Sequence, residues 1–174
     1  MILGGSFAEL PPGNCTAPMA VKKEVPMILT VLVRFKEIVV QGRDFPWPRP
    51  DRCPRCGSDR LWGHGFVRAI FDDCHDHVLL KRFRCPDCRC VVRLKPDGYF
   101  ERFQASVSTI RSRIAYRVKH GTWMGGMSRS RQWYWLRNLT RRSVALKGLS
   151  WNSRLLELFD DLINKGEIPV SRLR

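Results

Sequence analysis

The chain has 174 residues, enough for one ordinary domain or two small ones. Its 31 Lys and Arg residues exceed its 16 Asp and Glu residues, and the formal net charge of +15 predicts a polyanionic partner. The longest apolar run, Val25 to Val33, is interrupted by Pro26 and Thr30. It is about half as long as the ~20 residues that a membrane-spanning helix needs, so we expect no membrane partner.

The N-terminal 50 residues change character twice. Residues 1–26 are rich in Gly, Pro, Asn and Ser with little periodicity, so we expect a disordered tail. β-Branched residues become frequent over residues 27–40 and predict one or two strands. Residues 45–50 then place proline at every second position. We interpret residues 27–50 as strands followed by a stiff connector.

Two Cys-Pro-x-Cys knuckles are separated by 28 residues. Two residues between paired cysteines allow one tight turn to aim both sulfurs at a single point, and proline favours such a turn. Four thiolates then match the tetrahedral ligand set of a zinc ion. The sequence therefore predicts one structural Zn²⁺ site, formed by Cys53, Cys56, Cys85 and Cys88.

Disulfides or free buried thiols are the alternative interpretations, and two features disfavour disulfides. Seven cysteines leave one unpaired, and the N-terminus lacks the basic and apolar regions of a secretory signal. We therefore expect a cytoplasmic thiolate site. Cys74, His75 and His77 invite a second metal site, but their spacing fits no standard ligand set, which favours an exposed turn. Arg89 occupies the place that Gly57 has after the first knuckle, which predicts a strained or different second turn.

Residues 51–98 are predicted to form a small antiparallel zinc ribbon. Three strand patterns follow one another, at residues 61–71, 77–84 and 90–94. Such short hairpins bury too little apolar area to fold without the ion. Trp62 and Phe66 are interpreted as packing residues of the ribbon rather than as platforms for bases.

The periodicity becomes helical between residues 102 and 166. Ser106 is suited to the N-cap of a first helix, and Gly121 follows its C-terminus. A wide apolar stripe over residues 155–163 predicts another helix, and residues 167–174 are expected to form a tail. The predicted fold class is α+β: a zinc ribbon followed by a helical, helix-turn-helix-like region.

Between these helices, another is expected to begin at Ser128 or Ser130. Its inner side would carry Trp133, Leu136 and either Leu139 or Thr140. Aromatic residues at this spacing can also stack on single-stranded bases, but we favour a core position for Trp133.

Basic charge is concentrated in the helical region. No acidic residue lies between Arg102 and Leu156, whereas twelve Lys or Arg residues do, both ends included. In a helix-turn-helix unit the second helix inserts its N-terminal residues into the major groove, where Arg and Gln read base edges. Ser side chains and later arginines would contact phosphates. The predicted nucleic-acid contacts are Arg113, Arg117, Ser128, Arg129, Ser130, Arg131, Gln132, Arg137, Arg141 and Arg142.

Several segments resemble the zinc-ribbon head of bacterial insertion-sequence transposases and of short transposase-like proteins. The likeness is carried by the knuckles and strands at residues 53–57, 61–68 and 82–88, and by the segment 129–138. It spans residues 27–145 and implies DNA binding at element ends during transposition. The resemblance also implies a nucleoid-associated protein that acts as a homodimer or with a separate transposase. The carboxylate-bearing nuclease domain of a full transposase is absent, so the resemblance does not imply strand transfer.

The sequence therefore predicts a zinc-dependent DNA-binding protein without a catalytic domain of its own. Metal-dependent phosphoryl transfer needs several converging carboxylates, and Asp160 and Asp161 are adjacent and point in different directions. The same charge and aromatic content also fits an RNA-binding or ribosome-associated zinc-ribbon protein, or a transcriptional regulator. An enzyme with an undetected metal centre is the third hypothesis.

Overall fold

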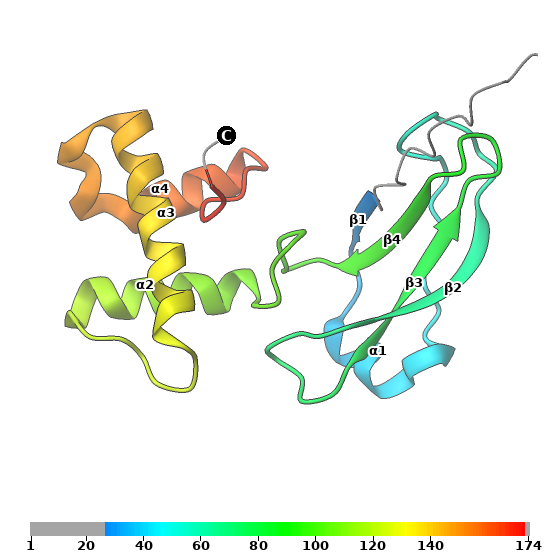
Figure 1. Ribbon diagram of the computed structural model, residues 1–174, viewed down its shortest axis with the longest axis horizontal. Coiled ribbons are helices and arrows are strands. Elements are labelled where there is room, and N and C mark those ends of the chain that lie inside the picture. The colour runs from blue at the N-terminus through cyan, green and yellow to red at the C-terminus, as the bar shows by residue number, and fades with distance from the viewer. Residues whose placement is uncertain (1–26, 173–174) are drawn as a thin grey trace, which may run out of the picture.

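The computed structural model describes residues 27–172 and has two halves joined by a short linker (Figure 1). We define the sheet half as residues 27–96, the linker as residues 97–104 and the helical half as residues 105–172. The mixed α+β class is confirmed. The disordered tail predicted for residues 1–26 lies outside the described residues. Within those residues, no helix combines the length and apolar character needed to cross a membrane.

The sheet half contains four strands: β1 Met27–Val31, β2 Trp62–Ala69, β3 Val78–Arg84 and β4 Val91–Pro96. Their order in the sheet is β1-β4-β3-β2. β2, β3 and β4 pair antiparallel, as expected for a ribbon, and a bulge between Gly63 and Phe66 shifts the register of β2. β1 adds a parallel strand on the other edge of β4. The predicted strand at the start of residues 27–40 therefore extends the ribbon sheet.

The second half of that same segment is a helix, contrary to prediction. α1 covers Phe35–Gln41 and is followed by a 3₁₀ turn, η1, over Gly42–Asp44. Ile38 is fully buried and packs in one cluster with Phe71 and Leu80, whereas Val39 and Val40 are exposed. Burial of one helix face therefore outweighs the strand propensity of three consecutive β-branched residues.

Two apolar clusters stabilise the sheet half. The first contains the buried ligand candidates Cys53 and Cys85. Its other buried members are Leu61, Phe83, Cys90, Val92 and Leu94. The second lies under α1 and consists of Ile38, Phe45, Phe71, Val78, Leu80 and Tyr99. Trp47, in the proline-rich connector, packs against both clusters, so the connector is part of the folded half.

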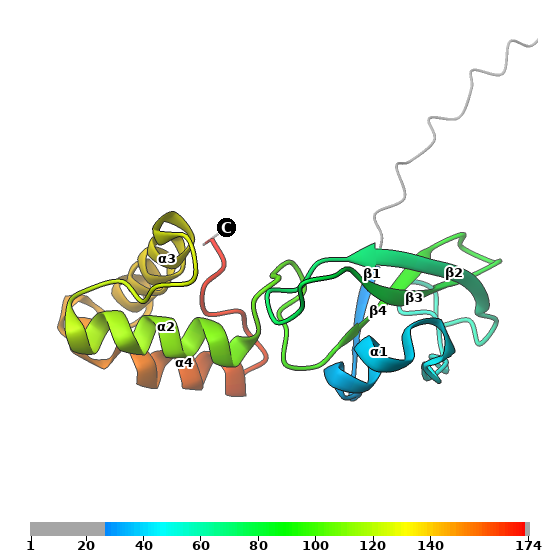
Figure 2. The same cartoon turned by 90° about the horizontal axis from the view of Figure 1, so that it is seen from below.

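The helical half contains α2 Val107–His120, α3 Arg129–Lys147, a 3₁₀ segment η2 over Leu149–Arg154, and α4 Leu155–Asn164. α2 and α4 lie side by side and α3 crosses them (Figures 1 and 2). Ser106 caps α2 by accepting a hydrogen bond from the Thr109 N–H, and Gly121 ends it at φ 68°, as predicted. Ser128 caps α3 in the same way.

The inner face of α3 differs from the predicted one. Trp135 is 1% exposed and packs with Leu139 in the helical core, whereas Trp133 is 48% exposed. The predicted core position of Trp133 is therefore wrong, although Leu139 is buried as expected. Positions two residues apart on a helix differ by about 200° in direction, so the burial of Trp135 leaves Trp133 on the opposite, outer face.

The C-terminal residues also belong to this core. Val170 is fully buried, and Asn138 Nδ2 donates to the Val170 carbonyl at 3.2 Å. Arg142 Nη1 forms an ion pair with Glu167 Oε2 at 2.9 Å. The predicted tail, up to Arg172, is thus docked on α3.

The linker is organised around one buried ammonium group. Lys95 Nζ donates to the backbone carbonyls of Phe100, Glu101 and Phe103, at 3.2 Å for Glu101 and 2.8 Å for Phe103. The Val107 N–H donates to the Gly98 carbonyl at 2.8 Å. These bonds satisfy all three Lys95 donors and fold the linker against the end of β4.

Candidate metal centre

The four knuckle cysteines converge at the end of the sheet half. Cys53 Sγ lies 3.6 Å from Cys88 Sγ, and Cys56 Sγ lies 3.6 Å from Cys85 Sγ. All four sulfurs lie within 4.8 Å of one another. Four sulfurs each ~2.3 Å from a central ion would be separated by about 3.8 Å, so the geometry fits a tetrahedral metal site. Disulfide sulfurs are only about 2 Å apart, so these cysteines are not disulfide-bonded.

Both knuckles use the same turn. The Cys53 N–H donates to the Ser58 carbonyl at 2.7 Å, and the Cys85 N–H donates to the Cys90 carbonyl at 3.0 Å. Gly57 has φ 77°, and Arg89, the only non-glycine residue with positive φ within residues 27–172, has φ 59°. Arg89 therefore takes the left-handed conformation at the cost of about 1–2 kcal/mol. Sequence analysis predicted that the second knuckle would be either strained or differently turned. It is strained, but its turn is the same as that of the first knuckle.

The pKa values of the thiols are shifted in different directions. Backbone N–H groups, that of Cys88 above all, lower the pKa of Cys85 to about 7. The Ser58 backbone favours a Cys56 thiolate, but burial and the neighbouring thiols of Cys88 and Cys85 raise the Cys56 pKa to about 12. Four thiolates at one point repel one another, and a divalent cation would allow all four to ionise.

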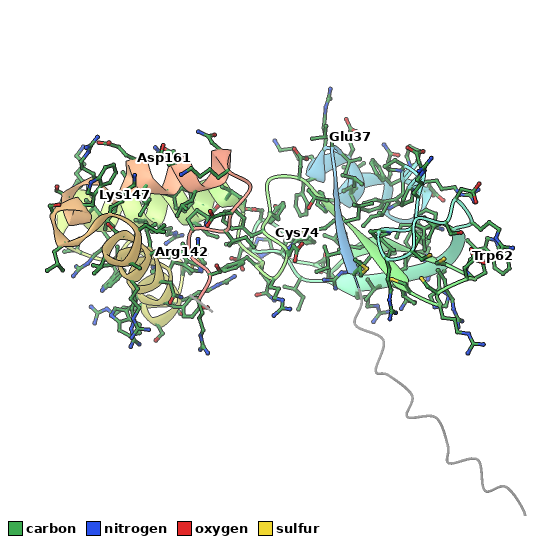
Figure 3. All side chains as sticks on the ribbon, turned by 90° about the horizontal axis from the view of Figure 1, so that it is seen from above. Glu37, Trp62, Cys74, Arg142, Lys147 and Asp161 are labelled. Carbon is green, nitrogen blue, oxygen red and sulfur yellow. The ribbon has the colours of Figure 1, made fainter. Side chains whose placement is uncertain are left out.

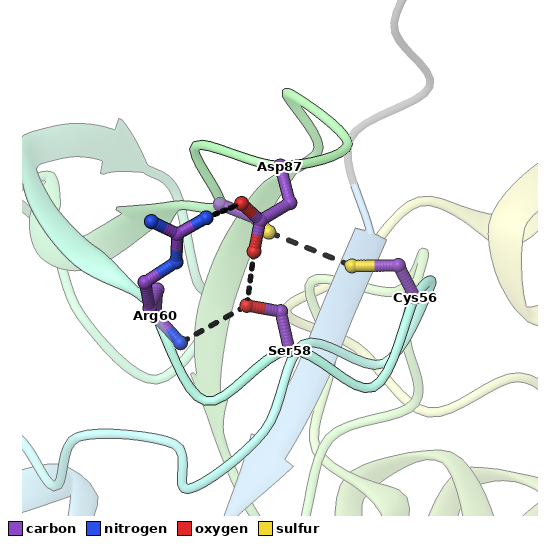
Figure 4. A network of polar contacts seen from close by, with 5 residues as sticks. Cys56, Ser58, Arg60 and Asp87 are labelled. Atoms are coloured by element: carbon purple, nitrogen blue, oxygen red, sulfur yellow. Dashed lines mark hydrogen bonds and ion pairs between the residues drawn. The ribbon is translucent and has the colours of Figure 1, made fainter.

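A polar network joins the two knuckles (Figure 4). Asp87, in the second knuckle, accepts hydrogen bonds from Ser58 Oγ and Arg60 Nη2 just after the first. The Arg60 N–H donates to Ser58 Oγ at 3.1 Å. The Ser58 hydroxyl, followed by Arg60, holds the pKa of Asp87 below its usual range. Contacts of this kind fix the positions of ligands that lie beside them.

The remaining cysteines do not add a second metal cluster within the described residues. Cys90 is buried beside the four-cysteine site, and burial raises its pKa to about 11. His75 and His77 lie in the exposed turn between β2 and β3. That turn contacts the rest of the molecule through its acids: Tyr99 Oη donates to Asp73 at 2.6 Å, and Arg131 pairs with Asp72 at 2.8 Å.

The chain was compared with models of protein families, with curated proteins and with solved structures. No match was found. The transposase-like assignment therefore rests on the knuckles and strands named above, and stays a prediction.

One predicted base-reading residue is unsuited to that role. Gln132 is 2% exposed, and its Nε2 donates to the Met124 carbonyl at 2.8 Å and the Met127 carbonyl at 3.2 Å. The side chain fastens the connection between α2 and α3 to α3 itself. We therefore remove Gln132 from the predicted nucleic-acid contacts.

Several predicted arginine contacts are already engaged. Arg131 pairs with Asp72, Arg142 pairs with Glu167, and Arg113 Nη1 donates to the Met124 carbonyl at 3.0 Å and to the Gly125 carbonyl. The Arg117 guanidinium lies 4.6 Å from the Trp123 ring centroid, an arrangement that leaves its charge unneutralised. The twelve basic residues of this region are therefore not equivalent.

A line of exposed side chains follows α3 at intervals of four residues: Arg129, Trp133, Arg137 and Arg141. We call this line the α3 stripe. The Arg137 guanidinium lies 4.7 Å from the Trp133 ring centroid. Ser128 and Ser130 are exposed beside its beginning. The exposure of Trp133 was missed because three consecutive aromatic residues, 133–135, give no indication of which one is buried.

Proposed function

We propose that the chain is a zinc-dependent DNA-binding protein, transposase-like or transposase-derived, with no catalytic domain of its own. In this proposal one Zn²⁺ ion organises the sheet half, and the α3 stripe contacts the phosphates of duplex DNA. The observation that carries the proposal is the α3 stripe, in which three arginines are exposed along one helix face.

Zinc is the metal that this donor set favours. Four thiolates in a tetrahedron suit Zn²⁺, which imposes no geometry through its d electrons and binds thiolates tightly. The cysteines come from two knuckles that bracket β2 and β3, so the ion would join both ends of that hairpin. A bound ion would supply folding free energy to a half whose apolar clusters are small.

The charges of the helical half support the choice of surface. Arg111, Arg142 and Arg154 pair with carboxylates in α4 or near it, and Arg131 pairs with Asp72. Within residues 27–172, Arg129, Arg137 and Arg141 form no such pair, and α3 itself carries no acidic residue. The stripe therefore presents unneutralised guanidinium groups, which attract phosphates.

The beginning of α3 adds to this surface. Ser128, Arg129 and Ser130 are exposed where the helix N-terminus favours negative charge. Contacts of this kind position a protein on the duplex without reading bases. With Gln132 buried, we propose binding that depends weakly on sequence.

Arg137→Gln tests the stripe, and Arg154→Gln, whose exposed arginine pairs with Glu157, is its matched control. Fluorescence anisotropy with a duplex oligonucleotide should show about tenfold weaker binding for Arg137→Gln, with a salt dependence lower by about one counterion. Arg154→Gln should differ from the wild type by less than about twofold. Equal losses in the two variants would contradict the proposal.

An RNA-binding function is the second candidate, favoured by the exposed Trp133 beside Arg137. Competition between the duplex and a folded RNA of equal length separates the two. Stronger retention of the RNA at physiological salt would reject the DNA proposal in favour of this one.

A further inference from the structure

Two arginines lie directly opposite each other in the middle of the sheet. Arg82 of β3 pairs in register with Arg93 of β4, so both side chains extend from the same face of the sheet. Like charges directly opposite destabilise a pair of strands. Within the described residues, neither arginine forms an ion pair with a carboxylate.

In each of the two guanidinium groups, one nitrogen is buried and has no hydrogen-bond acceptor. The Nε atoms of Arg82 and Arg93 are buried and make no hydrogen bond. In residues 27–96, the only other buried side-chain nitrogen or oxygen without a hydrogen-bond partner is Trp47 Nε1. All three of these atoms are hydrogen-bond donors. A buried polar group without a partner calls for an unseen water or ion, and a surplus of donors calls for an anion.

The surroundings of this pair are positively charged. Lys95 is two residues beyond Arg93 and therefore extends from the same face of β4. Burial, and then the charge of Arg93, lower the pKa of Lys95 to about 8. Arg84, two residues beyond Arg82, is exposed on this face as well. The Lys95 ammonium is buried and donates to three linker carbonyls, so it contributes only its charge. The anion would therefore contact guanidinium groups, those of Arg82, Arg84 and Arg93.

An exposed aromatic ring adjoins the row. Trp62 pairs in register with Arg84 and is a diagonal neighbour of Arg82. Its side chain is 61% exposed, contrary to the packing role predicted for it. Figure 3 shows Trp62 at the outer end of the sheet half, far from the helical half. A large exposed indole beside cationic groups suits the stacking of an unpaired base.

We propose that the end of this face formed by Arg82, Arg84, Arg93 and Trp62, beyond the part that α1 covers at Leu80, binds an unpaired strand of nucleic acid, with a phosphate between Arg82 and Arg93 and a base stacked on Trp62. The surface is separate from the α3 stripe, so the inference goes beyond the proposed function and does not depend on it. A duplex hides the faces of its bases inside the stack, whereas an unpaired strand exposes them to an indole.

The test measures binding of the full chain to a fluorescent oligothymidylate by anisotropy. Arg82→Gln and Arg93→Gln each remove one guanidinium, and Trp62→Leu removes the ring. Arg68→Gln is the matched control, because Arg68 is exposed on β2 but pairs with Leu79, which extends from the opposite face. Each of the three test variants should bind about tenfold more weakly, and the control should change by less than about twofold.

The melting temperature of each variant shows whether weaker binding is caused by loss of folding. Removing one of two opposed charges should leave the melting temperature of Arg82→Gln and Arg93→Gln unchanged or higher, since the pair has no structural partner. A marked fall would assign the arginines a structural role and overturn the proposal. Equal losses in Arg82→Gln and Arg68→Gln would also overturn it, because only total charge would then matter.

Separate binding measurements with oligothymidylate and with duplex DNA distinguish the sheet site from the duplex-binding function. Loss of oligothymidylate binding in Arg82→Gln with duplex binding retained supports the sheet site, whatever the α3 stripe does. Displacement of oligothymidylate by poly-glutamate at equal charge concentration would identify an acidic-protein surface instead. A wild-type chain that does not bind oligothymidylate at all would reject the sheet site directly.

Discussion

Cys56 is the most exposed of the four ligand candidates, and the contact of its thiol with the Ser58 backbone is outweighed by burial and the neighbouring thiols, which raise the Cys56 pKa to about 12. Its partners are buried or half-buried and are fixed by the knuckle turns. The left-handed conformation of Arg89 suggests that the second turn is stabilised from outside, because an L-residue gains nothing from it by itself. A bound ion is the simplest source of that stabilisation.

Cys56→Ser should therefore release the metal and unfold the sheet half. The whole site is worth on the order of 10 kcal/mol in small zinc domains, and loss of one thiolate removes much of it. Metal analysis and circular dichroism of the purified variant would show both effects. Cys74→Ser is the matched control, since Cys74 lies outside the cluster, and it should keep one ion per chain. Full metal content in Cys56→Ser would count against the site.

At the scale of elements, the linker depends on one side chain. Lys95 is 4% exposed, and its ammonium group donates to three linker carbonyls. Burial lowers its pKa from 10.5 to about 8. Lys95→Met would leave those carbonyls without their donor while removing the buried charge. Amide hydrogen exchange should be faster in residues 97–104 of this variant than in the wild type.

The pH dependence of stability gives a second measure of Lys95. Between pH 8 and pH 10.5 the unfolded chain keeps the Lys95 proton and the folded chain loses it, so the wild type gains stability as the pH rises. Relative to Lys95→Met, the gain is on the order of 3 kcal/mol. Urea unfolding of both proteins across this range measures it. A difference that stays flat or falls would contradict the buried-ammonium description.

Much of this element structure could be predicted from local sequence. The Cys-Pro-x-Cys spacing is sufficient to predict the four-cysteine cluster, because the ligand geometry leaves few alternatives. Ser106 and Gly121 mark both ends of α2, since capping depends on residues next to each other in the chain. The strands β2, β3 and β4 follow from alternation between two turns.

Other features depend on contacts between distant residues. α1 forms because Ile38 reaches a cluster built by β3 and the linker, which no local pattern encodes. Trp133 and Trp135 are equally apolar, so only packing against α4 decides which is buried. The opposed pair Arg82 and Arg93 requires the register of β3 and β4 to be known. These are the positions at which sequence analysis missed candidate functional residues.

At the scale of the whole molecule, two cationic surfaces are held on different halves. Four thiolates and one divalent ion together contribute −2, so the metal-bound chain would remain near +13. The halves are joined by the Lys95-centred linker and by the ion pair between Asp72 and Arg131. The two proposals together imply that one chain binds a single strand on the sheet and a duplex on α3 at once.

In the proposed function a metal ion organises the sheet half, so the coordination of that ion is the most direct test. Metal analysis of the purified chain, combined with X-ray absorption at the zinc edge, measures both stoichiometry and ligands. We predict one zinc per chain with four sulfur ligands at ~2.3 Å. A chain that unfolds cooperatively while free of metal, or an ion bound by fewer than three sulfurs, would contradict this prediction.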